Sequence, residues 1–260
     1  MTGFDTSVPH AARRYDYWLG GKDNFAADRE SGDAIAAQFP GIRTAVVENR
    51  RFLRRAVTSL ARTEGVRQFL DVGTGLPTVG NTHEVAQDIA ADSRIVYVDN
   101  DPLVLAHARA LLTGHPDGRT DYIDADLRDP AGILDGARAT LDFDRPIALM
   151  LLAVLHFVVD EDDPYALVRR FVDALPPGSF VVLSHATADY LSPQVAAAIT
   201  SGRHGQGQLR ARDEVARFLD GLDLIAPGVV PLPQWNDETE PPPRPPAEDV
   251  SMYAAVARKS

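Results

Sequence analysis

The pattern of hydrophobic positions changes character after about 65 residues. Before that point, apolar residues recur at spacings of three and four over 27–39 and 43–63, which predicts two helices separated by Pro40-Gly41. From residue 66 onward, short continuous apolar runs alternate with segments of helical pattern. We therefore expect a helical N-terminal extension over 1–65 and an α/β domain over 66–260.

Five apolar runs have the length of buried strands: 67–72, 94–99, 120–124, 146–155 and 179–184. The segments between them with a helical pattern are 80–92, 101–113, 130–140 and 163–175. This alternation predicts a doubly wound sheet of parallel strands, in which 149–155, the most apolar run, is a central strand. A proline-rich loop over 231–247 precedes the alternating run Val250–Ala257, which predicts a last strand that can enter the sheet antiparallel.

Composition excludes several classes of function. The 260 residues include no cysteine, which excludes disulfides, cysteine-based metal sites and thiol nucleophiles. A net charge of −11 disfavours nucleic acid as a partner, and the basic run 50–55 is interpreted as the solvated side of a helix. The acidic run 160–163 is interpreted as a helix start rather than a metal site. Without a signal-like N-terminus or an apolar run approaching about 18 residues, we expect a cytoplasmic protein without a membrane segment.

The strongest chemical motif is a glycine turn that follows the first predicted strand. Asp71 ends that strand, and Gly73, Thr74 and Gly75 follow it, so the backbone can approach a ligand closely. A carboxylate at Asp71 would oppose a pyrophosphate, and Thr78 stands where a dinucleotide motif has its third glycine. The turn therefore favours a ligand with an amino group over a dinucleotide.

The next two strand ends also carry acids. Asp99, followed by Asn100, lies where a carboxylate would bind both hydroxyls of a ribose, while Asp101 is suited to cap the following helix. Asp126 could accept a hydrogen bond from an adenine amino group, and the Leu127 backbone N–H could serve a ring nitrogen. Three consecutive strand ends thus predict a nucleoside site across the carboxyl edge of the sheet.

With these motifs, the stretch 67–160 resembles a class I S-adenosylmethionine-dependent methyltransferase. Nearly the whole chain resembles a bacterial S-adenosyl methyltransferase family, first catalogued as a domain of unknown function, through Arg14–Phe25, Asp71–Pro77, Phe218–Leu222 and Trp235. The resemblance implies a Rossmann-like, doubly wound, seven-stranded sheet whose last strand is antiparallel. It also implies S-adenosylmethionine as cofactor and S-adenosylhomocysteine as product.

The N-terminal motif offers further candidates. Gly20-Gly21 forms a tight turn before Lys22, Asp23 and Asn24, and the resemblance suggests that this turn closes over the methionine end of the cofactor or over the acceptor. Gly21, Lys22 and Asn24 are therefore candidate cofactor contacts, although a purely structural turn explains them equally well. Tyr15 and Tyr17 are candidate acceptor contacts.

Two histidines follow predicted strands and are candidate general bases, His156 and His185. A structural role is as consistent with His156 and is favoured for His185. The sequence Leu155-His-Phe157 replaces the Asn-Pro-Pro-aromatic run used for amino groups of bases and glutamines, which favours a small-molecule acceptor.

Two alternatives to a methyltransferase remain at this point. A non-catalytic regulatory protein that binds S-adenosylmethionine or S-adenosylhomocysteine would need the same motifs. A nicotinamide-dependent oxidoreductase is disfavoured by Asp71 and Thr78. The polar, glycine-rich segment 201–207 could be a lid over the acceptor or a plain connector. The sequence leaves the oligomeric state open.

Overall fold

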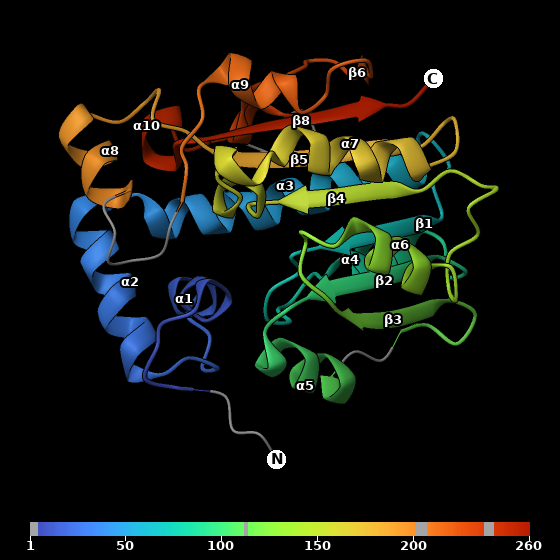
Figure 1. Ribbon diagram of the computed structural model, residues 1–260, viewed down its shortest axis with the longest axis horizontal. Helices are drawn as coiled ribbons and strands as arrows, with labels where there is room; N and C mark the ends of the chain where they lie inside the picture. The colour runs from blue at the N-terminus through green and yellow to red at the C-terminus, as the bar shows by residue number, and fades with distance from the viewer. Residues whose placement is uncertain (1–4, 112–113, 201–206, 237–241) are drawn as a thin grey trace.

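A mixed sheet of eight strands forms the centre of the molecule (Figure 1). The computed structural model describes residues 5–111, 114–200, 207–236 and 242–260. The sheet order is β3-β2-β1-β4-β5-β8-β6, and β7 also pairs with β8. The strands are β1 Gln68–Val72, β2 Arg94–Asp99, β3 Arg119–Asp124, β4 Ala148–Leu152, β5 Phe180–Ala186, β6 Asp223–Leu224, β7 Val230–Pro231 and β8 Met252–Arg258.

The predicted α/β fold with an antiparallel last strand is confirmed. Strands β1 to β5 pair in parallel, and β8 runs antiparallel to β5 with Val182 opposite Val256. The sheet has one strand more than the predicted seven. The addition is β7, whose two residues pair with β8 and are too few to produce a recognisable periodicity in the sequence.

Helices cover both faces of the sheet. They are α1 Ala11–Trp18, α2 Ala26–Gln38, α3 Ile42–Arg62, α4 Thr82–Ile89, α5 Pro102–Leu111, α6 Pro130–Ala137, α7 Pro164–Ala174, α8 Pro193–Thr200, α9 Arg212–Arg217 and α10 Ala247–Val250. Short 3₁₀ helices occur at η1 Leu155–Phe157, η2 Asp160–Asp162 and η3 Leu232–Gln234. One buried cluster joins the sheet to α6, α7 and α9, and a second joins the opposite face to α3 and α4. This is the two-sided burial that continuous apolar strands predict.

Helices α1 and α2 lie beyond the carboxyl ends of the parallel strands, on the left in Figure 1. Helix α3 connects them to the sheet, because its apolar face, which includes Phe52 and Val57, packs in the second cluster. A small third cluster contains Leu76 and Val104, and Ala12 of α1 packs against it. The N-terminal helices are therefore attached to the sheet at the end where its strand-end acids lie.

Some element boundaries differ from those predicted. Strand β4 ends at Leu152 rather than at 155, because Ala153 adopts a left-handed conformation with φ 52°. The apolar pattern nevertheless continues, since Leu155 of η1 is buried in the first cluster. Helix α8 was not predicted, and Val250, expected in the last strand, ends α10. Most of the glycine-rich segment, 201–206, lies outside the described residues, so its interpretation as a lid or a connector stays open.

Candidate functional site

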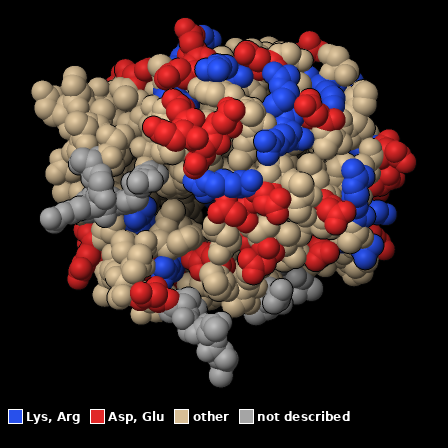
Figure 2. Space-filling model, in the orientation of Figure 1, with Lys and Arg blue, Asp and Glu red and all other residues tan. Residues whose placement is uncertain are grey.

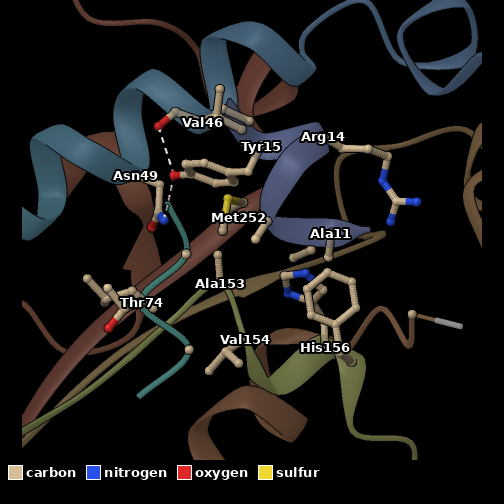
Figure 3. Close-up of a pocket in the computed structure, with 18 of the residues that line it drawn as sticks. Ala11, Arg14, Tyr15, Val46, Asn49, Thr74, Ala153, Val154, His156 and Met252 are labelled. Carbon is tan, nitrogen blue, oxygen red and sulfur yellow. Dashed lines mark hydrogen bonds between the residues drawn. The ribbon is translucent and has the colours of Figure 1, made fainter. Parts of the chain in front are cut away.

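A cavity of about 380 Å³ lies at the carboxyl end of the sheet. Its lining includes the glycine turn, the ends of β2, β3, β4 and β5, and residues of α1, α2, α3 and α8. Figure 3 shows the side of this cavity between Thr74, Tyr15 and His156. The sheet therefore supplies one wall and the N-terminal helices another.

The glycine turn has the backbone that its sequence requires. Gly73 and Gly75 have φ values of +77° and +69°, in the left-handed region that favours glycine. The Gly73 N–H donates to the Val98 carbonyl at 2.8 Å, which holds the turn against β2. A Cβ atom at Gly73 would collide with the side chain of Val154, whereas the space at Gly75 is open. Glycine at 73 is thus required by both conformation and packing.

Asp99 is held by backbone donors on two sides. Its Oδ2 accepts a hydrogen bond from the Gly75 N–H at 2.8 Å, and its Oδ1 accepts one from the Asp101 N–H at 2.9 Å. A carboxylate has about four acceptor positions, so each oxygen can still accept a ligand hydroxyl. Asp101 caps α5 as expected, because its Oδ1 accepts from the Leu103 N–H at 2.9 Å.

Asp71 lines the cavity as a nearly buried carboxylate, 5% exposed. Its Oδ2 accepts a hydrogen bond from the Thr82 hydroxyl at 2.6 Å. Burial raises the pKa of Asp71 to about 6, against the opposing effects of Thr82 and the Arg50 charge. A ligand cation beside Asp71 would compensate for this burial and favour the ionised carboxylate.

The end of β3 contributes a polar edge to the cavity. Asp126 accepts hydrogen bonds from the Asn100 amide at 3.2 Å and from the Arg128 backbone N–H at 2.8 Å. The side chain of Leu127 is buried between this edge and the first cluster. Asn100, Asp126 and Leu127 all line the cavity, so the structure brings the three predicted strand ends together.

The turn at 20–24 does not line the cavity, contrary to the expectation for Gly21, Lys22 and Asn24. Asp16 organises the turn instead: its Oδ2 accepts from the Asn24 amide at 2.8 Å and from the Asp23 N–H at 3.0 Å. A Cβ atom at Gly21 would collide with the Asp16 carboxylate, which explains the glycine. The structural alternative for this turn is the one that the geometry supports.

The two tyrosines differ. Tyr17 does not line the cavity, and its hydroxyl donates to Asp33 at 2.7 Å, so its role as an acceptor contact stays a prediction. Tyr15 does line the cavity, and burial raises the pKa of its hydroxyl. That hydroxyl donates to the Val46 carbonyl at 3.1 Å and accepts from the Asn49 amide at 3.0 Å (Figure 3). Tyr15 is therefore fixed to α3.

His156 lines the cavity, whereas His185 does not. His185 is 0% exposed; its Nδ1 lies 2.7 Å from the Ala186 carbonyl and its Nε2 lies 3.1 Å from Nη1 of Arg210. Because arginine can only donate, Nε2 accepts and Nδ1 donates, so both nitrogens are satisfied. This geometry agrees with the structural role that the sequence favoured for His185, and its catalytic role stays a prediction without support from the cavity lining.

The imidazole of His156 remains available. Its Nδ1 is buried without a hydrogen-bond partner among the described residues. Burial, together with the charges of Arg210 and Arg14, lowers the pKa of His156 to about 4. The ring is therefore neutral near pH 7 and keeps a lone pair that can accept a proton or a hydrogen bond.

Sequence reasoning missed three cavity arginines and one amide, Arg14, Arg50, Arg128 and Asn49. Arg50 belongs to the run that was interpreted as a solvated helix side, but it lines the cavity, and Arg55 of the same run is buried against the Trp235 carbonyl at 2.9 Å. A signal was available, because Asn49 and Arg50 follow Val46 by three and four positions and so share its apolar helix face.

The distribution of surface charges and of potential metal ligands does not point to a further function of this site. On the face in Figure 2, Lys and Arg side chains intermingle with Asp and Glu side chains. Among the described residues, no group of three or more His, Asp and Glu side chains could hold a metal ion. Within the same part of the chain, no helix has the length and apolarity needed to cross a membrane.

The strand order is that of the Rossmann-like fold of S-adenosylmethionine-dependent methyltransferases, and the glycine turn and the strand-end acids line its cavity. Within that class, the chain belongs to the S-adenosyl methyltransferase family, whose model matches residues 1–260. The cofactor of the family is S-adenosylmethionine, and the recognition made from the sequence motifs is confirmed.

Two solved structures are similar over nearly their full lengths. A DUF574 family protein from Streptomyces avermitilis MA-4680 is 46% identical, with a TM-score of 0.92 and coverage of 98% of this chain and 99% of that one. A candidate methyltransferase from Thermobifida fusca YX is 40% identical, with a TM-score of 0.89 and coverage of 98% and 96%.

A more distant neighbour shows the fold alone. Magnesium protoporphyrin IX methyltransferase from Synechocystis PCC 6803, with bound S-adenosylhomocysteine, is 14% identical, with a TM-score of 0.55 and coverage of 95% of this chain and 93% of that one. No curated protein sequence matches the chain.

Proposed function

We propose that the protein transfers a methyl group from S-adenosylmethionine to a small-molecule acceptor inside the cavity. The observation that carries the proposal is the two-sided lining: strand-end acids and a glycine turn on one wall, and α1, α2 and α3 on the other. A site that only bound the cofactor would need the first wall alone. The second wall offers the enclosure that alignment of an acceptor and exclusion of water require.

The cofactor, when bound, supplies an activated methyl group on a sulfonium. Three acids of this chain are assigned to hold it. Asp99 accepts from the ribose hydroxyls, Asp126 from the adenine amino group, and Asp71 balances the positive charge of the methionine amine. The free acceptor positions of Asp99 and the raised pKa of Asp71 support the first and third assignments.

His156 is the residue proposed to take a proton from the acceptor, where the acceptor carries one. Its unpartnered Nδ1 and its neutral state near pH 7 support this role. A pKa of about 4 makes it a weak base, so it suits an acceptor whose proton is released late, as methyl transfer proceeds. Alignment and exclusion of water carry the remainder of the rate enhancement.

Calorimetric titration with S-adenosylmethionine, S-adenosylhomocysteine and NADH tests the cofactor assignment. We expect binding of the first two ligands and none of NADH. An acceptor screen with a labelled methyl donor then tests catalysis. The variant His156→Gln should retain cofactor affinity and lose transfer if the residue is a base. Cofactor binding without transfer to any acceptor would instead indicate the regulatory alternative.

A further inference from the structure

The charges that line the cavity are divided between its two walls. Asp71, Asp99, Asp126 and Arg128 lie at or just beyond strand ends, whereas Arg14 and Asp16 come from α1 and Arg50 from α3. In Figure 3, Arg14 and Thr74 of the glycine turn lie on opposite sides of the cavity. Arg14 thus places a positive charge in a part of the cavity where the contacts assigned to the nucleoside need no cation.

Arg14 is a buried guanidinium, 6% exposed, and it is poorly compensated. Its Nη1 donates to the Ser31 hydroxyl at 3.3 Å, and its Nε has no hydrogen-bond partner among the described residues. Among the described residues, no carboxylate forms an ion pair with Arg14. Burial lowers the pKa of Arg14, against a weaker opposing effect of the Asp28 charge.

The Asp28 carboxylate already accepts hydrogen bonds from two backbone N–H groups. Its Oδ1 accepts from the His10 N–H at 2.8 Å and its Oδ2 from the Phe25 N–H at 2.9 Å. An arginine left buried without an anion is costly, and a bidentate carboxylate is the partner that its planar geometry suits best. An anionic ligand group beside Arg14 would compensate for the burial of its charge.

The surroundings of Arg14 are otherwise mainly apolar. The N-terminal helices, α8 and the start of β8 contribute the apolar side chains of Ile35, Phe39, Val46, Leu53, Ile199 and Met252 to the cavity lining. His156, whose pKa is lowered partly by the Arg14 charge, is neutral. A ligand that fits here needs an apolar body to match these walls and a negative group to match Arg14.

Two molecules could supply the negative group: the cofactor, through its methionine carboxylate, or the acceptor. Of the two other arginines in the lining, Arg128 pairs with Asp126 and Asp162, which leaves Arg50 for the cofactor. Arg50 lines the cavity beside the segment that follows the glycine turn, since its Nη2 donates to the Gly80 carbonyl at 3.0 Å, and its charge acts on the pKa of Asp71, where the methionine amine is assigned. The Arg14 charge acts on His156 instead, the proposed base. The arrangement therefore favours the acceptor as the source of the anion at Arg14.

We propose, resting on the methyltransferase function above, that the acceptor is an apolar small molecule with a carboxylate group, and that this carboxylate pairs with Arg14. The ion pair would position the acceptor from the helical wall, opposite the glycine turn. Arg14 would then select among acceptors by charge, and the apolar side chains around it would select by shape.

Matched acids and amides test the proposal without any substitution. The protein is first saturated with S-adenosylhomocysteine, and failure of that binding would count against the methyltransferase function rather than against the anion site. The complex is then titrated with 3-phenylpropanoate, 3-phenylpropanamide, octanoate and octanamide. We expect at least one acid to bind about tenfold or more tightly than its amide, because a charge-assisted, desolvated pair is lost in the amide. Equal affinities, or no binding of either acid, would overturn the proposal.

Variants of Arg14 identify the source of the anion. Arg14→Met should reduce acid binding to the level of the amide, Arg14→Lys should restore part of it, and both should leave S-adenosylhomocysteine affinity within about threefold of wild type. Arg43→Met is the matched control, since Arg43 belongs to the same N-terminal region, is half-exposed and does not line the cavity. A loss of about tenfold or more in S-adenosylhomocysteine affinity for Arg14→Met would assign the anion to the cofactor and overturn the proposal.

Discussion

Asp71→Asn should stabilise the ligand-free protein at neutral and alkaline pH. Burial raises the pKa of Asp71 from 3.8 to about 6, so the native state holds a proton that the unfolded chain has already released. The native protein therefore binds more protons between these two values, and its stability falls as pH rises through that window. Above about pH 6 the full cost of the buried carboxylate is present.

The expected change in the free energy of unfolding follows from the pKa shift of Asp71. About two pKa units at ~1.36 kcal/mol each correspond to ~3 kcal/mol, an upper figure because a buried site relaxes. Asparagine keeps the shape and can still accept the hydrogen bond that the Thr82 hydroxyl donates to Asp71. We therefore expect the variant to exceed wild type by ~1–3 kcal/mol at pH 8, with the difference disappearing toward pH 4.

Urea denaturation, followed by tryptophan fluorescence at intervals between pH 4 and pH 8, measures this difference. His156, whose pKa is lowered to about 4, has the opposite effect on stability, but it is present in both proteins and cancels in their comparison. Asp124→Asn, at an exposed strand end, is the matched control for the change from aspartate to asparagine. A variant no more stable than wild type at pH 8, or a difference that does not change with pH, would refute the reasoning.

Three further changes test other parts of the site. Asp99→Ala should weaken S-adenosylhomocysteine binding by about tenfold or more in calorimetry, because it removes the proposed ribose acceptor; unchanged affinity would contradict the assignment. Gly73→Ala should lower the free energy of unfolding by ~1–2 kcal/mol or more, since φ is +77° and a Cβ would meet Val154. His185→Phe should destabilise by ~1–3 kcal/mol, because buried Arg210 loses an acceptor, while the folded variant keeps its cofactor affinity.

The strand-end acids could be located from the sequence because a parallel sheet aligns its carboxyl ends. Asp71, Asp99 and Asp126 each follow an apolar run, and runs connected by helices must point the same way. Their convergence on one cavity follows from chain order and handedness alone. No detail of side-chain packing is needed for that step.

The two histidines show where that reasoning ends. His156 and His185 both lie at or just beyond the ends of neighbouring strands, yet one lines the cavity and the other is buried. The difference arises because β5 continues through His185, which pairs with Tyr253 of β8, while the chain leaves β4 at Ala153. Arg210, distant in sequence, then occupies the Nε2 side of His185.

The N-terminal motif shows a similar limit of sequence reasoning. Tyr15 and Asp16 line the cavity, whereas Tyr17 and the turn at Gly21 and Lys22 do not; Asp16 accepts a hydrogen bond from the Asp23 N–H in this turn. The orientation of α1 also places Arg14 in the cavity lining. Helical spacing alone cannot give this orientation, since α1 has polar or aromatic residues on every side.

The sequence by itself determined the alternation of the main strands and helices, the parallel sheet and the edge of the sheet at which the strand-end acids lie. These depend on periodicity and on chain connectivity, which are local or follow general rules. The tertiary structure decided which polar side chains face the cavity and which are satisfied elsewhere. Those outcomes depend on partners far apart in the chain, such as Asn49 with Ser184 and Arg210 with Asp160, which meet only after packing is complete.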